Sequence, residues 1–156
     1  MDEFTTPERT ALAETVREFT QRHITAELPQ WEAEGRIPVK LHRLAGEAGL
    51  AGLSYPEAVG GSGGDLVDTT IMIEEMLGAG ASGGLIAGLF TQGIATPHVI
   101  DEAQRRRDRG ETQAADYLED NYIRPVMAGD MIASLGVTEP DGGSDVSGLR
   151  TRAQSD

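Results

Sequence analysis

Residues 134–146 have the sequence SLGVTEPDGGSDV, in which a short apolar run gives way to a turn rich in hydroxyl groups and glycine. Thr138 and Ser144 supply hydroxyl groups, Pro140 fixes the backbone, and the glycines at 142–143 permit positive φ. Successive backbone N–H groups in such a turn can converge on an anion. By its chemistry alone, this stretch is equally compatible with a site for a neutral ring and a pyrophosphate and with an ordinary β-turn.

The hydrophobic pattern on either side of this stretch differs. Apolar residues recur every three to five positions in the first part of the chain, which predicts amphipathic helices. The apolar run at 131–137 instead ends in β-compatible residues and predicts a strand. We therefore expect a mainly α protein with two parts, a helical domain over residues 1–130 and the beginning of a β-domain over 131–156. Because one strand cannot pair its own backbone groups, we expect the chain to end partway into this second domain.

Proline, glycine and capping residues place the helices within the first part. A first helix is expected from Pro7 until Pro29 ends or kinks it, a second from Pro38 to Gly49, and a third over 66–78 with Asp65 or Asp68 as its cap. The apolar stretch 85–96 predicts a buried helix with a bend at Pro97 near its end. Residues 101–119 predict a solvated helix–loop–helix that includes the Arg105–Arg109 cluster. This gives about five helices packed as an orthogonal or bundle-like domain.

Composition excludes several classes of function. The chain has 26 Asp and Glu against 13 Lys and Arg, a formal charge of -13, so we expect no nucleic-acid binding. The absence of cysteine excludes disulfides, thiolate zinc sites and a Cys nucleophile. No apolar run approaches the ~20 residues that span a bilayer, and the acidic N-terminus lacks the features of a signal peptide. We therefore expect a cytoplasmic protein without a membrane span.

Two further candidates favour structural roles. His23, His42 and His98 lie far apart and fit no metal-ligand spacing, so no metal site is expected. The glycine-rich stretch at 60–64 does not have the spacing of a dinucleotide-binding loop and does not follow a predicted strand. A flexible loop between helices is the favoured interpretation of that stretch.

The stretch at 134–146, followed by GLRT at 148–151, closely resembles the flavin-binding signature of the acyl-CoA dehydrogenases. The Thr-Glu-Pro and Gly-Ser-Asp blocks at this spacing are highly specific. The opening helix, the loop with Tyr55-Pro56-Glu57 and Gly60-Gly61, and the helix with Ile73-Glu74-Glu75-Met76 resemble the N-terminal helical domain of that family. The resemblance spans nearly the whole chain. It implies an N-terminal helical domain followed by the first strand of a β-domain.

The resemblance also implies an activity, the FAD-dependent α,β-dehydrogenation of an acyl-CoA thioester in the catabolism of fatty or related acyl groups. In the family a Glu takes the α-proton and the flavin N5 takes a hydride from the β-carbon. Thr138 would bond the ring edge near N5, Val137 would supply backbone contacts, and Ser144 would lie at the pyrophosphate and also face the CoA ester. The implied FAD-binding residues are Leu135, Val137, Thr138, Gly143 and Ser144.

The acyl cavity would be lined in part by the helix at 85–96. Leu89 and Phe90 are the implied substrate-lining residues beside Ser144, with core packing as the stronger alternative for an apolar helix. The family also implies an acyl-CoA substrate and a homotetramer, and we expect this chain to self-associate.

Three departures from the family pattern qualify these expectations. Asp141 stands where the family most often has Gly, although Asp tolerates left-handed backbone. The segment from Pro97 to Met131 is longer than usual. The rest of the β-domain and the C-terminal helical domain, which in most subfamilies carries the catalytic Glu, do not occur in this sequence. Glu139 belongs to the turn and has a structural role, so we assign no catalytic residue and expect the isolated chain to be inactive.

Two other functions stay open at this point. The chain could be a non-catalytic helical interaction module or partner subunit derived from the family. It could also be a free-standing acidic helical domain with an unrelated ligand. Flavin absorbance of the purified protein would separate the dehydrogenase from both alternatives.

Overall fold

The computed structural model describes residues 4–154, and eight α-helices lie within that range. The ends of the two predicted domains at residues 1–3 and 155–156 lie outside the described residues, as do the first residues of the stretch inspected for a signal peptide. The α-helices are α1 Pro7–His23, α2 Leu28–Glu34, α3 Val39–Glu47, α4 Leu66–Gly78, α5 Gly83–Leu89, α6 Gln92–Asp108, α7 Thr112–Leu118 and α8 Arg124–Met127. Short 3₁₀ turns occupy Glu57–Val59 and Val146–Gly148, and a π-helical turn at Glu119–Ile123 joins α7 to α8.

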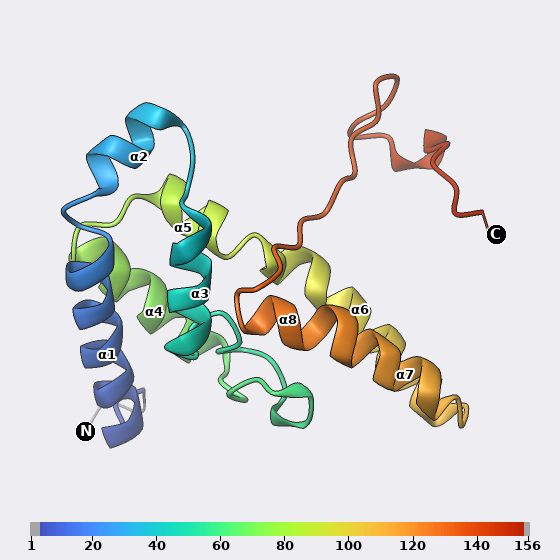
Figure 1. Cartoon of the computed structure of the whole chain (residues 1–156), viewed down its shortest axis with the longest axis horizontal. Coiled ribbons are helices and arrows are strands. Elements are labelled where there is room, and N and C mark those ends of the chain that lie inside the picture. Colours follow the sequence, from blue (N-terminus) through green and yellow to red (C-terminus); the bar gives the residue numbers. More distant parts are fainter. Residues whose placement is uncertain (1–3, 155–156) are drawn as a thin grey trace.

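Helices α1 to α5 gather around one core, while α6 and α7 form a hairpin that projects from it (Figure 1). All five of these helices contribute apolar side chains to the core. Removal of these side chains from water drives the packing of the helices. A second, smaller cluster joins the loop before α4 to α6 and α8 through Tyr55, Val59, Ala103, Ile123 and Met127. The buried members of the main core are Val16, Phe19, Ile24, Leu28, Leu41, Ala45, Leu50, Met72, Met76, Ala81, Leu85, Ile86 and Leu89.

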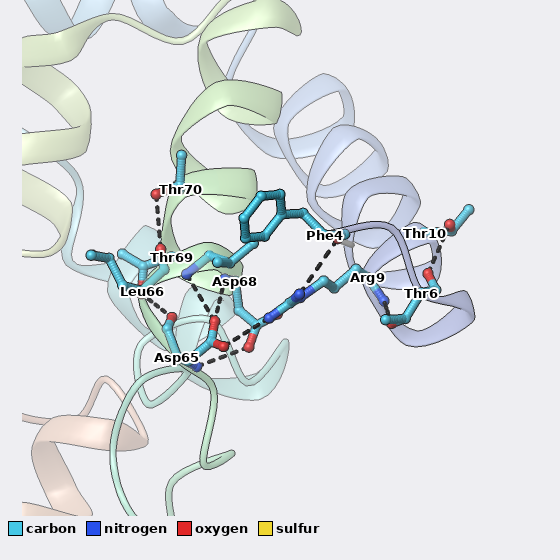
Figure 2. Close-up of polar contacts among 10 residues, drawn as sticks. Phe4, Thr6, Arg9, Thr10, Asp65, Leu66, Asp68, Thr69 and Thr70 are labelled. Carbon is cyan, nitrogen blue, oxygen red and sulfur yellow. Dashed lines mark hydrogen bonds and ion pairs between the residues drawn. The ribbon is translucent and has the colours of Figure 1, made fainter. Parts of the chain in front are cut away.

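An ionic clasp joins the beginnings of α1 and α4, far apart in sequence (Figure 2). Arg9 of α1 donates from Nη2 to Asp65 Oδ2 at 2.7 Å and from Nε to Asp68 Oδ1 at 2.9 Å. Asp65 also accepts hydrogen bonds from the backbone N–H groups of Val67 and Asp68, while the Asp68 carboxylate accepts from the N–H of Asp65. This capping box begins α4 where the sequence predicted it.

The structure confirms the mainly α fold expected from the sequence. The predicted helices at 38–49 and 66–78 form, and Gly49 has the left-handed φ of 74° that ends the former. The charged helix–loop–helix also forms, with its turn at Gly110.

Two helix boundaries were predicted wrongly. Pro29 does not end the first helix, because α1 already ends at His23 and Pro29 lies in the first turn of α2, where a missing N–H costs nothing. The helix predicted at 85–96 is two helices, α5 and α6. The α-helical hydrogen bonds, which run to the carbonyl four residues earlier, are interrupted between them. Gly93 and Ile94 donate instead to the carbonyls three residues earlier. Pro97 consequently lies inside α6 and not near a helix end.

The strand predicted at 131–137 does not form in the described residues. A strand is defined by its partner, and no neighbouring segment in residues 4–154 pairs with this one. The segment instead leaves α8 and extends away from the helices (Figure 1). Its apolar side chains remain exposed, among them Leu135 at 47% and Val137 at 42%.

Candidate functional site

The turn predicted to bind the flavin is closed by one pair of backbone hydrogen bonds. The N–H of Glu139 donates to the Gly142 carbonyl at 2.9 Å, and the N–H of Gly142 donates back at 3.2 Å. The turn does not use the positive φ that glycine permits at 142–143, because neither glycine has it. Asp141 likewise needs no left-handed conformation, since no described non-glycine residue has positive φ.

Glu139 ties the turn to the chain that follows it. Its carboxylate accepts hydrogen bonds from the backbone N–H of Arg150 at 2.9 Å, from the backbone N–H of Thr151 at 2.7 Å and from the Thr151 hydroxyl. The Thr151 hydroxyl first, and then the two N–H groups, lower the pKa of Glu139. An ionised carboxylate that accepts these three hydrogen bonds anchors the backbone of the turn.

A second local anchor follows in the same segment. Asp145 accepts from the N–H of Ser147 at 3.0 Å and from its hydroxyl at 2.6 Å, and these bonds, the hydroxyl first, lower the pKa of Asp145. The hydroxyls of Thr138 and Ser144 have no partner among the described residues, and both side chains are exposed. The segment therefore fixes its backbone with its carboxylates and leaves these two hydroxyls available.

All five predicted cofactor residues lie in this exposed segment, and Gly143 has open space around its α-carbon. The predicted substrate-lining residues Leu89 and Phe90 lie elsewhere, at the end of α5. The segment extends away from the helices (Figure 1), so the two sets do not form one pocket within residues 4–154.

Leu89 and Phe90 differ in their surroundings. Leu89 is 1% exposed and packs in the main core, whereas Phe90 is half-buried and lines a hollow of about 230 Å³. The polar residues of that hollow were not among the predicted site residues. The hydroxyl of Tyr55 donates to the Gln92 carbonyl at 3.3 Å, and burial raises the pKa of Tyr55. Tyr55 was noted only as part of a loop motif, and nothing local in the sequence pairs it with Gln92.

The arginine cluster is not an anion site, because its members are paired. Arg105 bonds Asp101, Arg106 bonds Glu102 and Arg109 bonds Glu111 at 2.8 to 2.9 Å. No group of three His, Cys, Asp or Glu side chains in the described range could hold a metal ion. None of the helices in that range combines the length and apolar character needed to cross a bilayer.

Comparison with known proteins agrees with this architecture. Residues 6–107 match the family model described as acyl-CoA dehydrogenase, N-terminal domain. The chain is 29% identical over 150 residues to an acyl-CoA dehydrogenase of Bacillus subtilis, covering 95% of this chain and 36% of that protein. It is 29% identical over 143 residues to the mitochondrial long-chain specific acyl-CoA dehydrogenase of Sus scrofa, covering 92% of this chain and 30% of that protein.

A solved structure supports the same relationship. The crystal structure described as a probable acyl CoA dehydrogenase from Mycobacterium abscessus superposes with a TM-score of 0.81 at 49% identity, covering 96% of this chain and 37% of that one. The chain therefore spans about a third of the length of the relatives it matches. Its helical part matches the family's N-terminal domain, and the chain belongs to the acyl-CoA dehydrogenase family.

Proposed function

We propose that this chain contributes the N-terminal helical domain, residues 1–130, and the beginning of the flavin-binding β-domain, residues 131–156, to an enzyme that dehydrogenates an acyl-CoA thioester between Cα and Cβ. The observation that carries the proposal is the exposed turn at 138–151. In a chain of this family, it anchors its backbone through Glu139 and leaves the Thr138 and Ser144 hydroxyls unbonded.

The donor set of this turn fits FAD. Exposed hydroxyls and backbone N–H groups suit a neutral ring edge and a pyrophosphate. Thr138 would bond the ring edge, with Leu135 and Val137 beside the ring, and Gly143 and Ser144 would hold the pyrophosphate. Gly143 allows close approach because nothing lies within 4 Å of where its Cβ would be. Bound flavin would accept the hydride from the β-carbon, while these residues would bind and orient it.

For the acyl group, we propose a contribution from Phe90. It lines the hollow beside Tyr55 and Gln92, whereas the burial of Leu89 in the main core supports a packing role for that residue. Ser144 would face the thioester from the turn. No residue of this chain is proposed as the base that removes the α-proton.

Flavin titration tests the proposal in two steps. Each hydrogen bond contributes only ~0.5–1.5 kcal/mol, while micromolar binding needs about 8 kcal/mol, so the 156-residue chain should bind FAD weakly or not at all. Fusing the chain to the remaining part of the Mycobacterium abscessus relative should restore binding. Thr138→Ala with Ser144→Ala should then weaken FAD binding in the fusion by roughly tenfold or more.

The matched control removes two exposed hydroxyls from helices, Thr15→Ala with Thr112→Ala, and should leave flavin binding unchanged. If the fusion binds FAD equally well with and without Thr138 and Ser144, these residues do not hold the cofactor. Tight binding by the short chain would show that the turn, or a dimer of it, suffices.

An interaction module is the alternative function, and the exposed apolar side chains of 131–137 favour it. Unpaired backbone groups beside Leu135 and Val137 can pair with the same segment of a second copy. We expect light scattering to show self-association that Leu135→Asp with Val137→Asp removes. Val39→Asp with Leu66→Asp, which changes exposed apolar residues on helices, should leave the association intact. A monomeric wild-type chain would contradict this alternative.

A further inference from the structure

A hollow of about 390 Å³ lies where α2, α3 and α5 meet. Its walls are mainly apolar, with Leu28 and Trp31 from α2, Ile37 from the following loop and Leu85 from α5. At ~30 Å³ for each water molecule, this volume corresponds to roughly a dozen waters. The size and lining suit a small, mostly apolar molecule.

Of the polar side chains in this wall, His42 of α3 is the buried one. It is 8% exposed, and burial lowers its pKa because the charged ring loses solvation, while a hydrogen bond to the Leu89 backbone partly offsets the shift. A neutral imidazole has one donor and one acceptor nitrogen. Because His42 lines the hollow, the acceptor nitrogen of its neutral ring can take a hydrogen bond from a donor placed there.

The rest of the lining leaves room for a ligand without favouring a charge. A Cβ at Gly84 would meet only the Ser82 hydroxyl, at 3.9 Å, so the backbone of α5 is open to close approach. The charged lining residues are Glu32 and Arg36, of opposite sign. A neutral molecule is therefore favoured over an ion.

We propose that this hollow binds a small uncharged molecule whose apolar body lies against Trp31 and whose single hydroxyl donates to His42. The apolar walls supply the affinity, and the acceptor nitrogen of His42 selects for the hydroxyl. The site does not depend on flavin or on acyl-CoA, so its test is separate from that of the proposed function.

Fluorescence measures this binding directly, because Trp31 is the one tryptophan in the sequence. The 156-residue chain is titrated with 4-butylcyclohexanol and with its methyl ether, which has the same apolar body but no donor. We expect a saturable change in Trp31 emission and roughly tenfold tighter binding of the alcohol. His42→Phe should abolish that preference. Equal binding of alcohol and ether to the wild type would overturn the role of His42.

A pair of glycine variants tests the location. Gly84→Leu places a side chain in the hollow, whereas Gly83→Leu makes the same change one residue earlier, outside the lining and with nothing within 4 Å. Both changes favour a helix, so neither should unfold α5. Binding should fall at least tenfold in Gly84→Leu and stay unchanged in Gly83→Leu. No emission change in the wild type, or equal behaviour of the two variants, would overturn the proposal whether or not His42→Phe folds.

Discussion

The helical part of the chain and the segment after α8 satisfy their backbones in different ways. In residues 4–130 most backbone hydrogen bonds run within helices or in the loop between α3 and α4, and long-range packing buries apolar side chains of the helices. In residues 131–154 a few backbone pairs, such as Glu139 with Gly142, and two accepting carboxylates, Glu139 and Asp145, make the hydrogen bonds, and the large apolar side chains stay exposed. From this difference we expect the local anchors to shape the turn without contributing to the stability of the helical domain.

The two regions should differ most in how a Gly→Ala substitution changes the free energy of unfolding. A Cβ at Gly46 of α3 would lie 2.3 Å from the backbone of Ala128, whereas a Cβ at Gly136 would meet nothing within 4 Å. Alanine normally stabilises a helix interior, but here α8 cannot move away without losing its packing on α3. We expect Gly46→Ala to lower the free energy of unfolding by about 3 kcal/mol.

Gly136→Ala is the matched control and should leave the free energy of unfolding within about 0.5 kcal/mol of the wild type. Urea unfolding followed by circular dichroism measures both variants. Equal stabilities would show that α3 and α8 are not in tight contact.

A smaller effect is expected in the helical hairpin, where one arginine bonds two acids of different burial. Arg107 bonds Glu119 at 2.6 Å and Asp116 at 2.9 Å, and the side chain of Glu119 is 7% exposed against 52% for Asp116. Loss of a buried charge partner costs far more than loss of an exposed one. Glu119→Ala should therefore destabilise the chain by about 2 kcal/mol in urea unfolding.

Asp116→Asn, which acts on the same guanidinium, should change the free energy of unfolding by less than about 0.5 kcal/mol. A cost for Asp116→Asn as large as that for Glu119→Ala would mean that burial does not set the strength of these pairs.

Features that depend on local sequence were predictable. The capping residue Asp65 and the glycine at 49 act within a few residues, and they placed the beginning of α4 and the end of α3 correctly. The break between α5 and α6 was missed because an apolar run does not reveal where its hydrogen-bond ladder changes. The prediction of a strand at 131–137 was wrong because composition indicates only that a segment suits a strand. A strand forms only when a second segment pairs with it.

The candidate site shows the same division. The family signature predicts the turn at 138–145 and a structural role for Glu139 within it. The sequence did not reveal that this carboxylate bonds Arg150 and Thr151, or that Tyr55 bonds Gln92 across the fold. The Tyr55–Gln92 bond is set by tertiary packing, and the Glu139 bonds by the path of the chain over 11 and 12 residues, and no short-range pattern encodes either.

The smallest expected effect is on the pH dependence of stability. It concerns one carboxylate in each region, Asp65 among the helices and Glu139 in the segment after α8, and the pKa of each is lowered. The pKa of Asp65 is lowered first by the N–H of Asp68, then by that of Val67 and by Arg9, and the pKa of Glu139 is lowered by Thr151 and Arg150. A carboxylate whose pKa is lower in the folded state than in the unfolded state stabilises the folded state. This contribution is complete at a pH above the unfolded-state pKa of about 4. The contribution is lost as the pH falls through the pKa of the carboxylate in the folded state. Asp65 joins two core helices, whereas Glu139 anchors only the exposed segment.

We therefore expect Asp65→Ala to lower the Tm by about 3 °C near pH 7, and the difference from the wild type to shrink as the pH falls below about 4. Glu139→Ala should leave the Tm unchanged at every pH, because no core element depends on the turn. Its effect should appear instead in hydrogen exchange, as lost protection of the Arg150 and Thr151 amides. A Tm change in Glu139→Ala equal to that in Asp65→Ala would mean that the segment after α8 unfolds together with the helices, and the contrast between the two regions would then fail.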